Sequence, residues 1–180
     1  MKKSTLRKKI VKKRSKFNNK DFELNPNIII NLIKKNTNKK KVGLYYPFNG
    51  ELSTLNLIDK MIKKKFEVSL PIIKKKFQLY FYKWRPQDPL KVNKFGIPEP
   101  LPLKKTTPSI LIIPLVAFDK NLNRLGYGGG YYDRLIQKIE KKMNCLKIGL
   151  ALSCQKIDKV PIGKFDKKMN FIVTEKKIYK

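Results

Sequence analysis

The sequence predicts an α/β fold, a three-layer α/β/α sandwich built around a mostly parallel central sheet. Runs of strand length alternate along the chain with segments whose apolar residues recur at helical spacing. One run, 109–114 (SILIIP), is apolar nearly throughout, which is typical of a central parallel strand covered on both faces. The 180 residues are enough for a single domain with a substantial core.

Two helices are expected in the first part of the chain. Residues 1–17 are rich in lysine, and Leu6 and Ile10 fall on one helix face, so a basic amphipathic helix is predicted there. The segment NPNIIINLIKK predicts a second helix, with Asn25 as its N-cap and Pro26 at its first helical position.

Strands and further helices follow in alternation. The segment STLNLIDKMIKK predicts a helix capped by Ser53, with Leu55, Ile58 and Ile62 at helical spacing. Another helix is expected after the glycine-rich segment, through about residue 142. Besides SILIIP, strands are predicted at 41–47, 66–71, 76–84, 146–152 and 170–174.

The stretch 84–108 holds six of the eleven prolines and shows little periodicity. We expect a long loop there, ordered by its contacts. Loops of that length inside a compact domain are usually functional or mobile.

Composition excludes several kinds of site. The chain has no histidine, which rules out a serine–histidine triad. Its two cysteines, Cys145 and Cys154, are not spaced as a zinc motif, so a structural zinc site is not expected. A metal in this protein should be a hard cation on oxygen ligands, with Mg²⁺ the first candidate.

The formal net charge of +30 raises the possibility of nucleic-acid binding. Lysine far outnumbers arginine, however, and Asn, Ile, Phe and Tyr are plentiful, as in proteins of AT-rich genomes. No apolar run approaches the roughly 20 residues that span a bilayer, and the basic N-terminus lacks the apolar stretch of a secretory signal. We therefore expect a soluble, cytoplasmic protein without a membrane partner.

Four of the nine glycines lie within 126–130, inside the segment RLGYGGGYYDRLI. This segment follows SILIIP at the expected carboxyl end of the central strand, where α/β sheets bind ligands. Bare backbone N–H groups at a helix N-terminus form an anion cradle, and Arg124 and Arg134 can add charge. If a phosphate binds there, its repulsion with the carboxylate of Asp133 suggests a cation between the two. The alternative is a tight turn whose tyrosines are core, and neither the Walker nor the dinucleotide pattern fits.

The segment IPLVAFDKNLNRLGYGGGYYDRLI closely resembles the signature of the 5-formyltetrahydrofolate cyclo-ligase family. Weaker similarities keep the family's order along nearly the whole chain: KSTLR at 3–7, YYPFNGELST, FGIPEP and VPIGKFDKKMNFIVTEKKI. The resemblance implies the NagB/RpiA/CoA transferase-like variety of α/β sandwich. It also implies that residues 1–180 form one cyclo-ligase domain that works as a monomer.

Members of that family use ATP and Mg²⁺ to convert 5-formyltetrahydrofolate to 5,10-methenyltetrahydrofolate. The implied chemistry is phosphorylation of the formyl oxygen, ring closure from nitrogen-10, and release of ADP and phosphate. The substrate supplies its own nucleophile, so a chain without histidine can carry out this reaction. The protein has to align the two substrates and neutralise charge.

The resemblance also implies site residues. Catalytic roles fall on Arg124, Tyr132 and Asp133, and metal ligation on Asp133 and Asp166. ATP contacts are implied for Lys3, Ser4, Thr5, Leu6, Arg7, Arg124, Leu125, Gly126, Tyr127, Gly128, Gly129, Gly130, Tyr131 and Tyr132. Folate contacts are implied for Tyr46, Glu51, Phe95, Tyr127, Gly128, Gly129, Gly130 and Tyr131.

Several of these residues have a second interpretation. Lys3 and Arg7 suit a solvated basic helix, Asp166 a surface loop, and Glu51 a helix cap near Ser53. Asp119 is expected to fix its loop without acting in the chemistry.

The chain departs from the family pattern at two positions. Leu115 stands where members often have glycine, and Phe95 where some have tryptophan; both keep an apolar surface.

A different class of function stays open at this point, a basic RNA- or ribosome-associated protein. In that case the interleaved aromatics of QLYFYKW would stack on bases.

Overall fold

The computed structural model describes residues 2–16 and 24–180, so both ends of the first expected helix, residues 1 and 17, lie outside the described residues. The helices are α1 (Lys3–Ser15), α2 (Pro26–Asn36), α3 (Leu55–Lys63), α4 (Tyr131–Glu140) and the short 3-10 helix η2 (Ser153–Gln155). The strands of the main sheet are β1 (Lys41–Gly43), β2 (Glu67–Lys74), β3 (Gln78–Lys83), β6 (Lys105–Thr106), β7 (Ile110–Pro114), β10 (Leu146–Leu150), β11 (Phe171–Val173) and β12 (Ile178–Tyr179).

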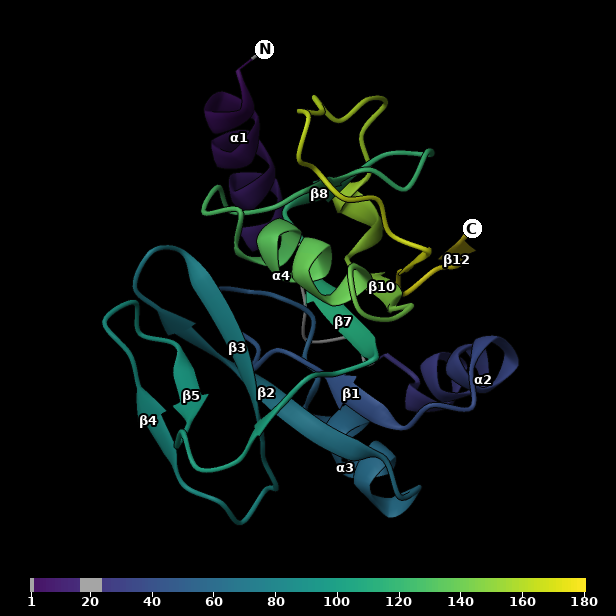
Figure 1. Ribbon diagram of the computed structural model, residues 1–180. Helices are drawn as coiled ribbons and strands as arrows, with labels where there is room; N and C mark the ends of the chain where they lie inside the picture. Colours follow the sequence, from purple (N-terminus) through teal and green to yellow (C-terminus); the bar gives the residue numbers. More distant parts are fainter. Residues whose placement is uncertain (1, 17–23) are drawn as a thin grey trace.

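These strands form one sheet in the order β12-β11-β10-β7-β1-β2-β3-β6 (Figure 1). Its inner five strands, β11, β10, β7, β1 and β2, are parallel, and the outer strands pair antiparallel. Strand β7 lies between β10 and β1, as expected for SILIIP. The predicted α/β class with a mostly parallel sheet is therefore confirmed.

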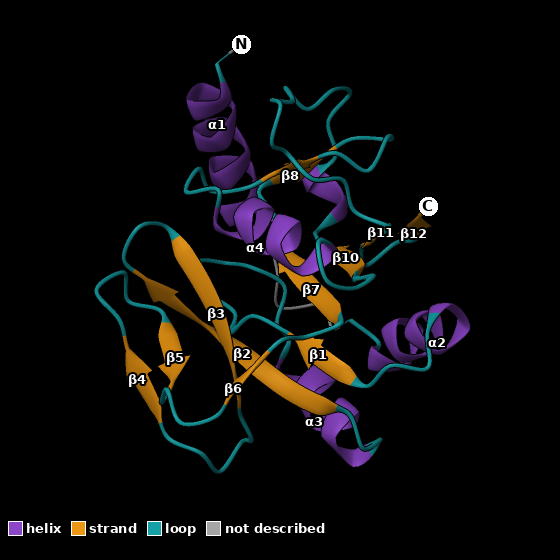
Figure 2. Cartoon of the chain, in the orientation of Figure 1, coloured by secondary structure: helices purple, strands orange, loops and turns teal. Residues whose placement is uncertain are grey.

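Helices cover both faces of the sheet. Residues of β7 alternate between two apolar clusters: Ile110 and Ile112 pack in the cluster that contains α2 and α3, and Leu111 and Ile113 in the cluster that contains α4. This alternation is why the strand is apolar at every position. Helix α1 packs instead on a two-stranded ribbon, β8 (Ala117–Phe118) and β9 (Arg124–Leu125), as Figure 2 shows.

The N-terminus of α2 has the predicted N-cap, whereas the N-terminus of α3 does not. The side chain of Asn25 accepts from the N–H of Asn27, with Pro26 in the first turn of α2, as predicted. The N-cap of α3 is Thr54 and not Ser53; the Thr54 hydroxyl donates to the Tyr45 carbonyl at 2.6 Å and caps no N–H, whereas Ser53 Oγ accepts from the Leu55 N–H at 3.4 Å. The buried face of α3 includes Ile58, whereas Leu55 is exposed.

The proline-rich stretch 84–108 is not wholly a loop. It contains a small hairpin, β4 (Leu90–Val92) with β5 (Pro98–Pro100), and the edge strand β6. Glu99 holds the hairpin to the sheet, since its carboxylate accepts from the N–H of Ile73 and from the Asn93 amide, both at 2.8 Å. Prolines permit these short edge strands because edge positions need no ladder N–H.

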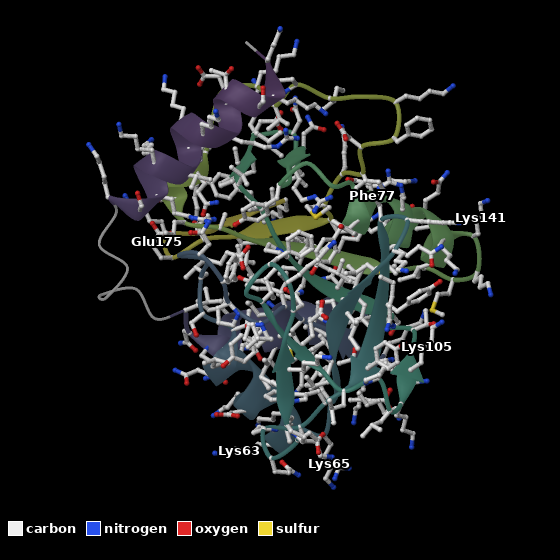
Figure 3. The ribbon with its side chains drawn as sticks, turned by 90° about the vertical axis from the view of Figure 1, so that its left-hand side faces the viewer. Lys63, Lys65, Phe77, Lys105, Lys141 and Glu175 are labelled. Atoms are coloured by element: carbon white, nitrogen blue, oxygen red, sulfur yellow. The ribbon has the colours of Figure 1, made fainter. Side chains whose placement is uncertain are left out.

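The lysines that give the chain its charge lie largely on the outside. Lys63, Lys65, Lys105 and Lys141 are exposed; the first two lie close together, and Lys105 and Lys141 lie elsewhere on the surface (Figure 3). Among the described residues, no helix combines the length and apolar character needed to cross a membrane. Both cysteines are buried and unpaired.

Candidate active site

A cavity of about 760 Å³ opens at the carboxyl end of the parallel strands. Pro114 at the end of β7 and Tyr45 just after β1 lie in its wall, which is the place where α/β sheets bind ligands. Helix α1, the β2–β3 hairpin, the tip of the β4–β5 hairpin and the glycine-rich segment complete the wall. Its volume is in the range of small-molecule and cofactor sites.

The cavity brings together most of the residues that the sequence singled out. Those that line it are Lys3, Arg7, Tyr46, Glu51, Phe95, Arg124, Leu125, Gly126, Tyr127, Gly128, Gly129, Gly130, Tyr131, Tyr132, Asp133 and Asp166. Three expected residues do not line it: Ser4 and Thr5 are exposed, and Leu6 is buried against the β8–β9 ribbon.

One end of the cavity is cationic. Arg124 is 8% exposed, and its Nη2 donates to Oδ1 of Asp133 at 2.9 Å. Its Nε is buried and has no hydrogen-bond partner among the described residues. A buried donor without a partner is costly, so this atom is a ready site for an anionic oxygen.

Helix α1 adds two more cations at this end. Arg7 donates from Nε to the carbonyl of Gly126 at 2.7 Å, which ties α1 to the glycine-rich segment. Lys3 pairs with Asp166 at 2.5 Å. Although partial burial acts to raise it, the hydrogen bond and charge of Lys3 hold the pKa of Asp166 below its usual value. Lys3 and Arg7 thus belong to the cavity wall, not to a fully solvated helix face.

The glycines have conformational reasons to be there. Gly128 has a φ of +112° and Gly130 a φ of +62°, which L side chains rarely adopt. Gly130 is the N-cap of α4, so the first N–H groups of that helix open onto the same end of the cavity. A Cβ at Gly128 would lie 3.3 Å from Cζ of Arg7, within the space that faces the cations.

The two aspartates here fit a hard cation that also binds phosphate. Asp133 Oδ1 accepts from Arg124 and from the N–H of Lys167, and Asp166 Oδ2 from Lys3 and the N–H of Gly163. No group of three or more Cys, Asp or Glu side chains among residues 2–16 and 24–180 is placed to hold a metal by itself. Mg²⁺ commonly uses one or two carboxylates together with substrate phosphates, and these two side chains suit that arrangement.

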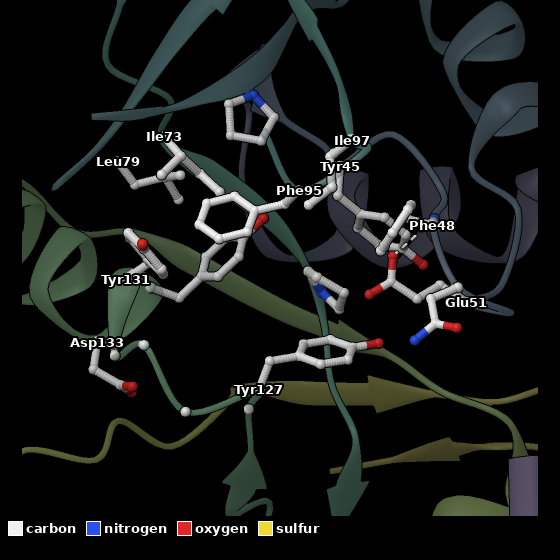
Figure 4. A pocket seen from close by; sticks show the side chains of 18 of the residues that line it. Tyr45, Phe48, Glu51, Ile73, Leu79, Phe95, Ile97, Tyr127, Tyr131 and Asp133 are labelled. Atoms are coloured by element: carbon white, nitrogen blue, oxygen red, sulfur yellow. Dashed lines mark hydrogen bonds between the residues drawn. The ribbon is translucent and has the colours of Figure 1, made fainter. Parts of the chain in front are cut away.

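Glu51 lies at the other end, on the far side of the cavity from Asp133 (Figure 4). It closes a tight turn in which Asn49 and Gly50 have positive φ, its N–H donates to the Phe48 carbonyl, and its carboxylate accepts from the Phe48 N–H at 3.1 Å. Burial raises the pKa of Glu51 to about 7, and hydrogen bonding to Tyr127 and Phe48 and the charge of Arg14 offset only part of that rise. The carboxyl is thus held by its turn at the cavity and does not cap α3.

Aromatic side chains line the cavity between its cationic end and the end at Glu51. Tyr127, in the glycine-rich segment, lies along the wall between Asp133 and Glu51 in Figure 4. Burial, together with the nearby Glu51 charge, raises its phenol pKa well above the usual value, so the hydroxyl stays protonated. Phe95, 48% exposed at the tip of the β4–β5 hairpin, faces the same space. A flat heteroaromatic ligand is suited to such walls.

Eleven of the residues that line the cavity were missed by sequence reasoning, among them Tyr45, Phe48, Phe77 and Ile97. Tyr45 and Phe48 flank the expected Tyr46 and Glu51, and Phe77 and Ile97 come from hairpins. Phe77 has a φ of +55° and is 57% exposed, yet its ring lies 5.9 Å from that of Tyr131. Only the folded hairpin brings it to the cavity, so no local pattern marks it.

Two other interpretations are settled by burial. Asp119 is fully buried and accepts four hydrogen bonds, from Asn121, Asn123 twice, and Val160, so it fixes its loop as expected.

The aromatics of QLYFYKW do not form an exposed stacking surface, because Phe81, Tyr82 and Trp84 are buried. Three of the four aromatics of that run are therefore not available to stack on bases.

Solved structures of similar shape exist. The NMR structure of 5,10-methenyltetrahydrofolate synthetase from Aquifex aeolicus is 33% identical, with a TM-score of 0.79 over 99% of this chain and 92% of the other. A 5,10-methenyltetrahydrofolate synthetase from Mycoplasma pneumoniae, 23% identical, has a TM-score of 0.76 over 97% and 99% of the two chains, and this likeness is one of fold alone.

Sequence comparison agrees with the fold. Proteins named 5-formyltetrahydrofolate cyclo-ligase are 40% identical over 146 residues in Haemophilus influenzae, covering 76% of each chain, and 35% identical over 147 residues in Escherichia coli K12, covering 77% of this chain and 79% of the relative. The statistical model of the 5-formyltetrahydrofolate cyclo-ligase family matches residues 1–175. Given this match along almost the entire length, the chain belongs to the 5-formyltetrahydrofolate cyclo-ligase family.

Proposed function

We propose that this protein is an ATP-dependent ligase that converts 5-formyltetrahydrofolate to 5,10-methenyltetrahydrofolate. The observation that carries the proposal is a single cavity with a cationic end, at Lys3, Arg7 and Arg124, and a carboxyl–aromatic end, at Glu51 and Tyr127. A reaction between a triphosphate and a folate needs both ends in one space. Membership of the family supports the same activity.

The cationic end is where the triphosphate of ATP would lie. Lys3, Arg7 and the unpartnered Nε of Arg124 offer positive charge, and the N-terminus of α4 adds backbone donors. Tyr131, Tyr132 and Leu125, which line the cavity beside them, limit the access of water to the phosphates. Charge that develops on the transferring phosphoryl group is stabilised by donors already in place.

Asp133 and Asp166 are the residues that would hold Mg²⁺. Held there, the ion would neutralise phosphate charge. Without phosphates, Arg124 and Lys3 balance these carboxylates, which keeps both side chains ordered in the free protein.

Glu51 and its neighbours would bind the pterin ring of the folate. A carboxylate can accept from the ring N–H and the 2-amino group of a pterin, and Tyr46, Tyr127 and Phe95 can pack on its faces. In this arrangement the formyl group would lie between the pterin end and the phosphates.

The chemistry then proceeds in two steps. The formyl oxygen attacks the γ-phosphorus of ATP, and the bond to the ADP oxygen breaks. Nitrogen-10 next attacks the formyl carbon, the C–O bond breaks to release phosphate, and the proton of nitrogen-10 is lost to give the methenyl product. The protein's contribution is alignment and charge stabilisation.

A direct assay tests this function. The protein is mixed with 5-formyltetrahydrofolate, ATP and Mg²⁺, and absorbance in the methenyl-folate band is followed. The band should grow only when both substrates are present, with ADP and phosphate formed in equal amounts. Absence of product with a folded protein, or growth of the band without ATP, would overturn the proposal.

We also infer that residues 1–180 form one domain that works as a monomer, with the NagB/RpiA/CoA transferase-like arrangement. The cavity is lined by residues from across the whole chain, which supports a complete site within one copy. Two buried, unpaired cysteines fit a reducing cytoplasm. Light scattering at the concentration of the assay would test the oligomeric state.

A further inference from the structure

Arg14, near the carboxyl end of α1, is a buried cation for which the proposed chemistry gives no role. It is 2% exposed, and its Nη2 donates to the carbonyl of Asn49 at 2.5 Å. It forms no ion pair within 4.0 Å across the part of the chain that the structure describes. A guanidinium is buried at considerable cost, so a contact that justifies its burial is expected.

The carbonyl that Arg14 binds belongs to the turn that presents Glu51. Asn49 and Gly50 have φ values of +51° and +73°, and the turn is closed by the bond from the Glu51 N–H to the Phe48 carbonyl. The Arg14 bond is a link from outside the turn, and it joins the turn to a different element, α1. Loss of that bond would remove the link that fixes this turn to α1.

The same guanidinium also faces the aromatic wall. Its Cζ lies 5.8 Å from the ring centre of Tyr127, within the range of a cation–π contact. Arg14 therefore touches both the turn of Glu51 and the side chain that separates the two ends of the cavity. Lysine cannot reproduce this pair of contacts, because it lacks the planar fork.

Helix geometry connects Arg14 to the cationic end of the cavity, where the phosphates of ATP would lie. At 100° per residue, Lys3, Arg7 and Arg14 fall within an arc of about 40° on α1, and Lys3 and Arg14 are about 16 Å apart along the axis. One stripe of one helix thus supplies cations to both ends of the cavity. If α1 moves when phosphates bind, the turn that presents Glu51 would move with it.

We propose that Arg14 is a positioning residue, which holds the turn 48–51 and the Tyr127 ring so that Glu51 meets the pterin as a correctly placed carboxylate. This inference rests on the proposed function. It adds a residue that touches neither substrate and links the nucleotide-binding helix to the folate end.

The titration of Glu51 distinguishes a positioning role of Arg14 from a merely structural role, because a merely structural role would leave that titration unchanged. The charged and titratable groups that act on this carboxyl are Arg14 from α1, Tyr127 from the glycine-rich segment, Tyr45 after β1 and Tyr132 from α4. The three phenols keep their protons in the neutral range, because burial raises their pKa values. Arg14 is the cation of this set that lowers the pKa of Glu51, so its removal should raise that pKa further.

The test compares Arg14→Gln and Arg14→Lys with Lys12→Gln, which removes an exposed cation from the same helix. Equilibrium binding of 5-formyltetrahydrofolate is measured from about pH 5.5 to 8.5, a range that spans the Glu51 pKa of about 7. Thermal unfolding of each variant without ligand shows whether it folds. The Glu51 carboxyl is also titrated by carbon NMR on glutamate-labelled protein, which needs no folate.

For Arg14→Gln we expect a folate dissociation constant raised about tenfold at pH 7, with the midpoint of its pH profile moved to higher pH. Arg14→Lys should keep the midpoint close to that of the wild type and still bind folate more weakly, because charge stays while the fork is lost. Lys12→Gln should match the wild type in both respects. If Arg14→Gln does not fold, Arg14→Lys decides by folate affinity: binding weaker than that of the wild type supports the inference, and equal binding overturns it.

Two results would overturn the inference. One is folate affinity equal to the wild type at every pH in a folded Arg14 variant. The other is, for Arg14→Gln, affinity lowered by the same factor at all pH values with an unshifted Glu51 titration, since loss of the Arg14 charge should raise the pKa of Glu51. Failure of the wild type itself to bind folate would instead overturn the proposed function.

Discussion

The guanidinium of Arg124 and the carboxylate of Asp133 are joined at 2.9 Å at the cationic end of the cavity. Arg124 comes from β9 and Asp133 from the first turn of α4, so the pair spans the whole glycine-rich segment. The arginine side chain is 4% exposed and the aspartate 18%. The bond holds one guanidinium nitrogen and leaves buried Nε free to meet a ligand.

Asp133→Asn should lower turnover far more than stability. The change removes a proposed Mg²⁺ ligand and the charge that balances Arg124, and the loss of such an electrostatic group costs on the order of 100-fold in turnover. Unfolding should become easier by about 1–3 kcal/mol, because a charged hydrogen bond is weakened. Turnover is measured against Mg²⁺ concentration, beside a thermal scan.

Glu140→Gln is the matched control for that substitution. Glu140 is on the same helix, pairs with Lys147 and Lys167 and is exposed, away from the cavity. Its loss should change turnover little. Near-normal activity of Asp133→Asn at limiting Mg²⁺ would remove Asp133 from the metal site.

Glu51→Gln should weaken folate and leave ATP almost unchanged. A charge-assisted pair of hydrogen bonds to the pterin contributes about 1.5–3 kcal/mol, so the folate dissociation constant should rise roughly tenfold to a hundredfold. Calorimetric titration with each substrate separately measures the two effects. Equal weakening of both would mean that Glu51 serves the fold.

The raised pKa of Glu51 also predicts how stability depends on pH. Its usual value is 4.5 and its folded value about 7, so between these the native state holds a proton that the unfolded state has lost. The contribution is therefore fully present below pH 4.5 and is lost as pH rises to about 7. Glutamine has no proton to lose and keeps the neutral form.

Denaturant unfolding of wild type and Glu51→Gln across this pH range checks the sign. As pH rises from 4.5 to 7, the stability of the wild type relative to the variant should fall by roughly 2–3 kcal/mol. Carboxyls whose pKa is lowered, such as Asp166, titrate in both proteins and cancel in the difference. A flat difference would show that Glu51 is ionised normally in the fold.

Gly128→Val should abolish stabilisation by ATP. A branched Cβ would meet the guanidinium of Arg7 and enter the phosphate space, and φ of +112° is strained for valine. The variant is first examined for a cooperative thermal transition and then for a rise in its midpoint with ATP and Mg²⁺. We expect a folded variant whose midpoint does not rise.

Gly96→Val separates strain from steric blocking. Its φ is +77°, and its Cβ would meet only the Phe48 ring, 3.6 Å away, outside the phosphate end. This control should lose stability through strain and keep the rise with ATP. If Gly128→Val keeps that rise as well and still turns over, the glycine-rich segment is only a tight turn.

Much of this molecule follows from the sequence by itself. SILIIP had to be a strand covered on both faces, because every position after Ser109 is apolar, and Asn25-Pro26 had to begin a helix, because one caps and the other lacks an N–H. The sequence also places the glycine-rich segment after that strand, at the carboxyl end of the sheet, where α/β folds bind ligands. Local chemistry and strand order are enough for these features.

Other parts of the cavity depended on contacts between distant segments. Arg14 continues the buried face of Leu6 and Ile10 at intervals of four residues, a signal present in the sequence that points to burial but not to Asn49 as its partner. Phe77 reaches the cavity only because the β2–β3 hairpin folds over α4, and its exposure and positive φ follow from that fold.

Tertiary structure also decided the electrostatics. Sequence marks Glu51 as a carboxyl near Ser53, where it could cap a helix. The fold places it in a closed turn beside Tyr127 and Arg14, and burial there raises its pKa to about 7. Desolvation depends on which segments cover a group, and that is a property of the packed chain and not of its neighbours in sequence.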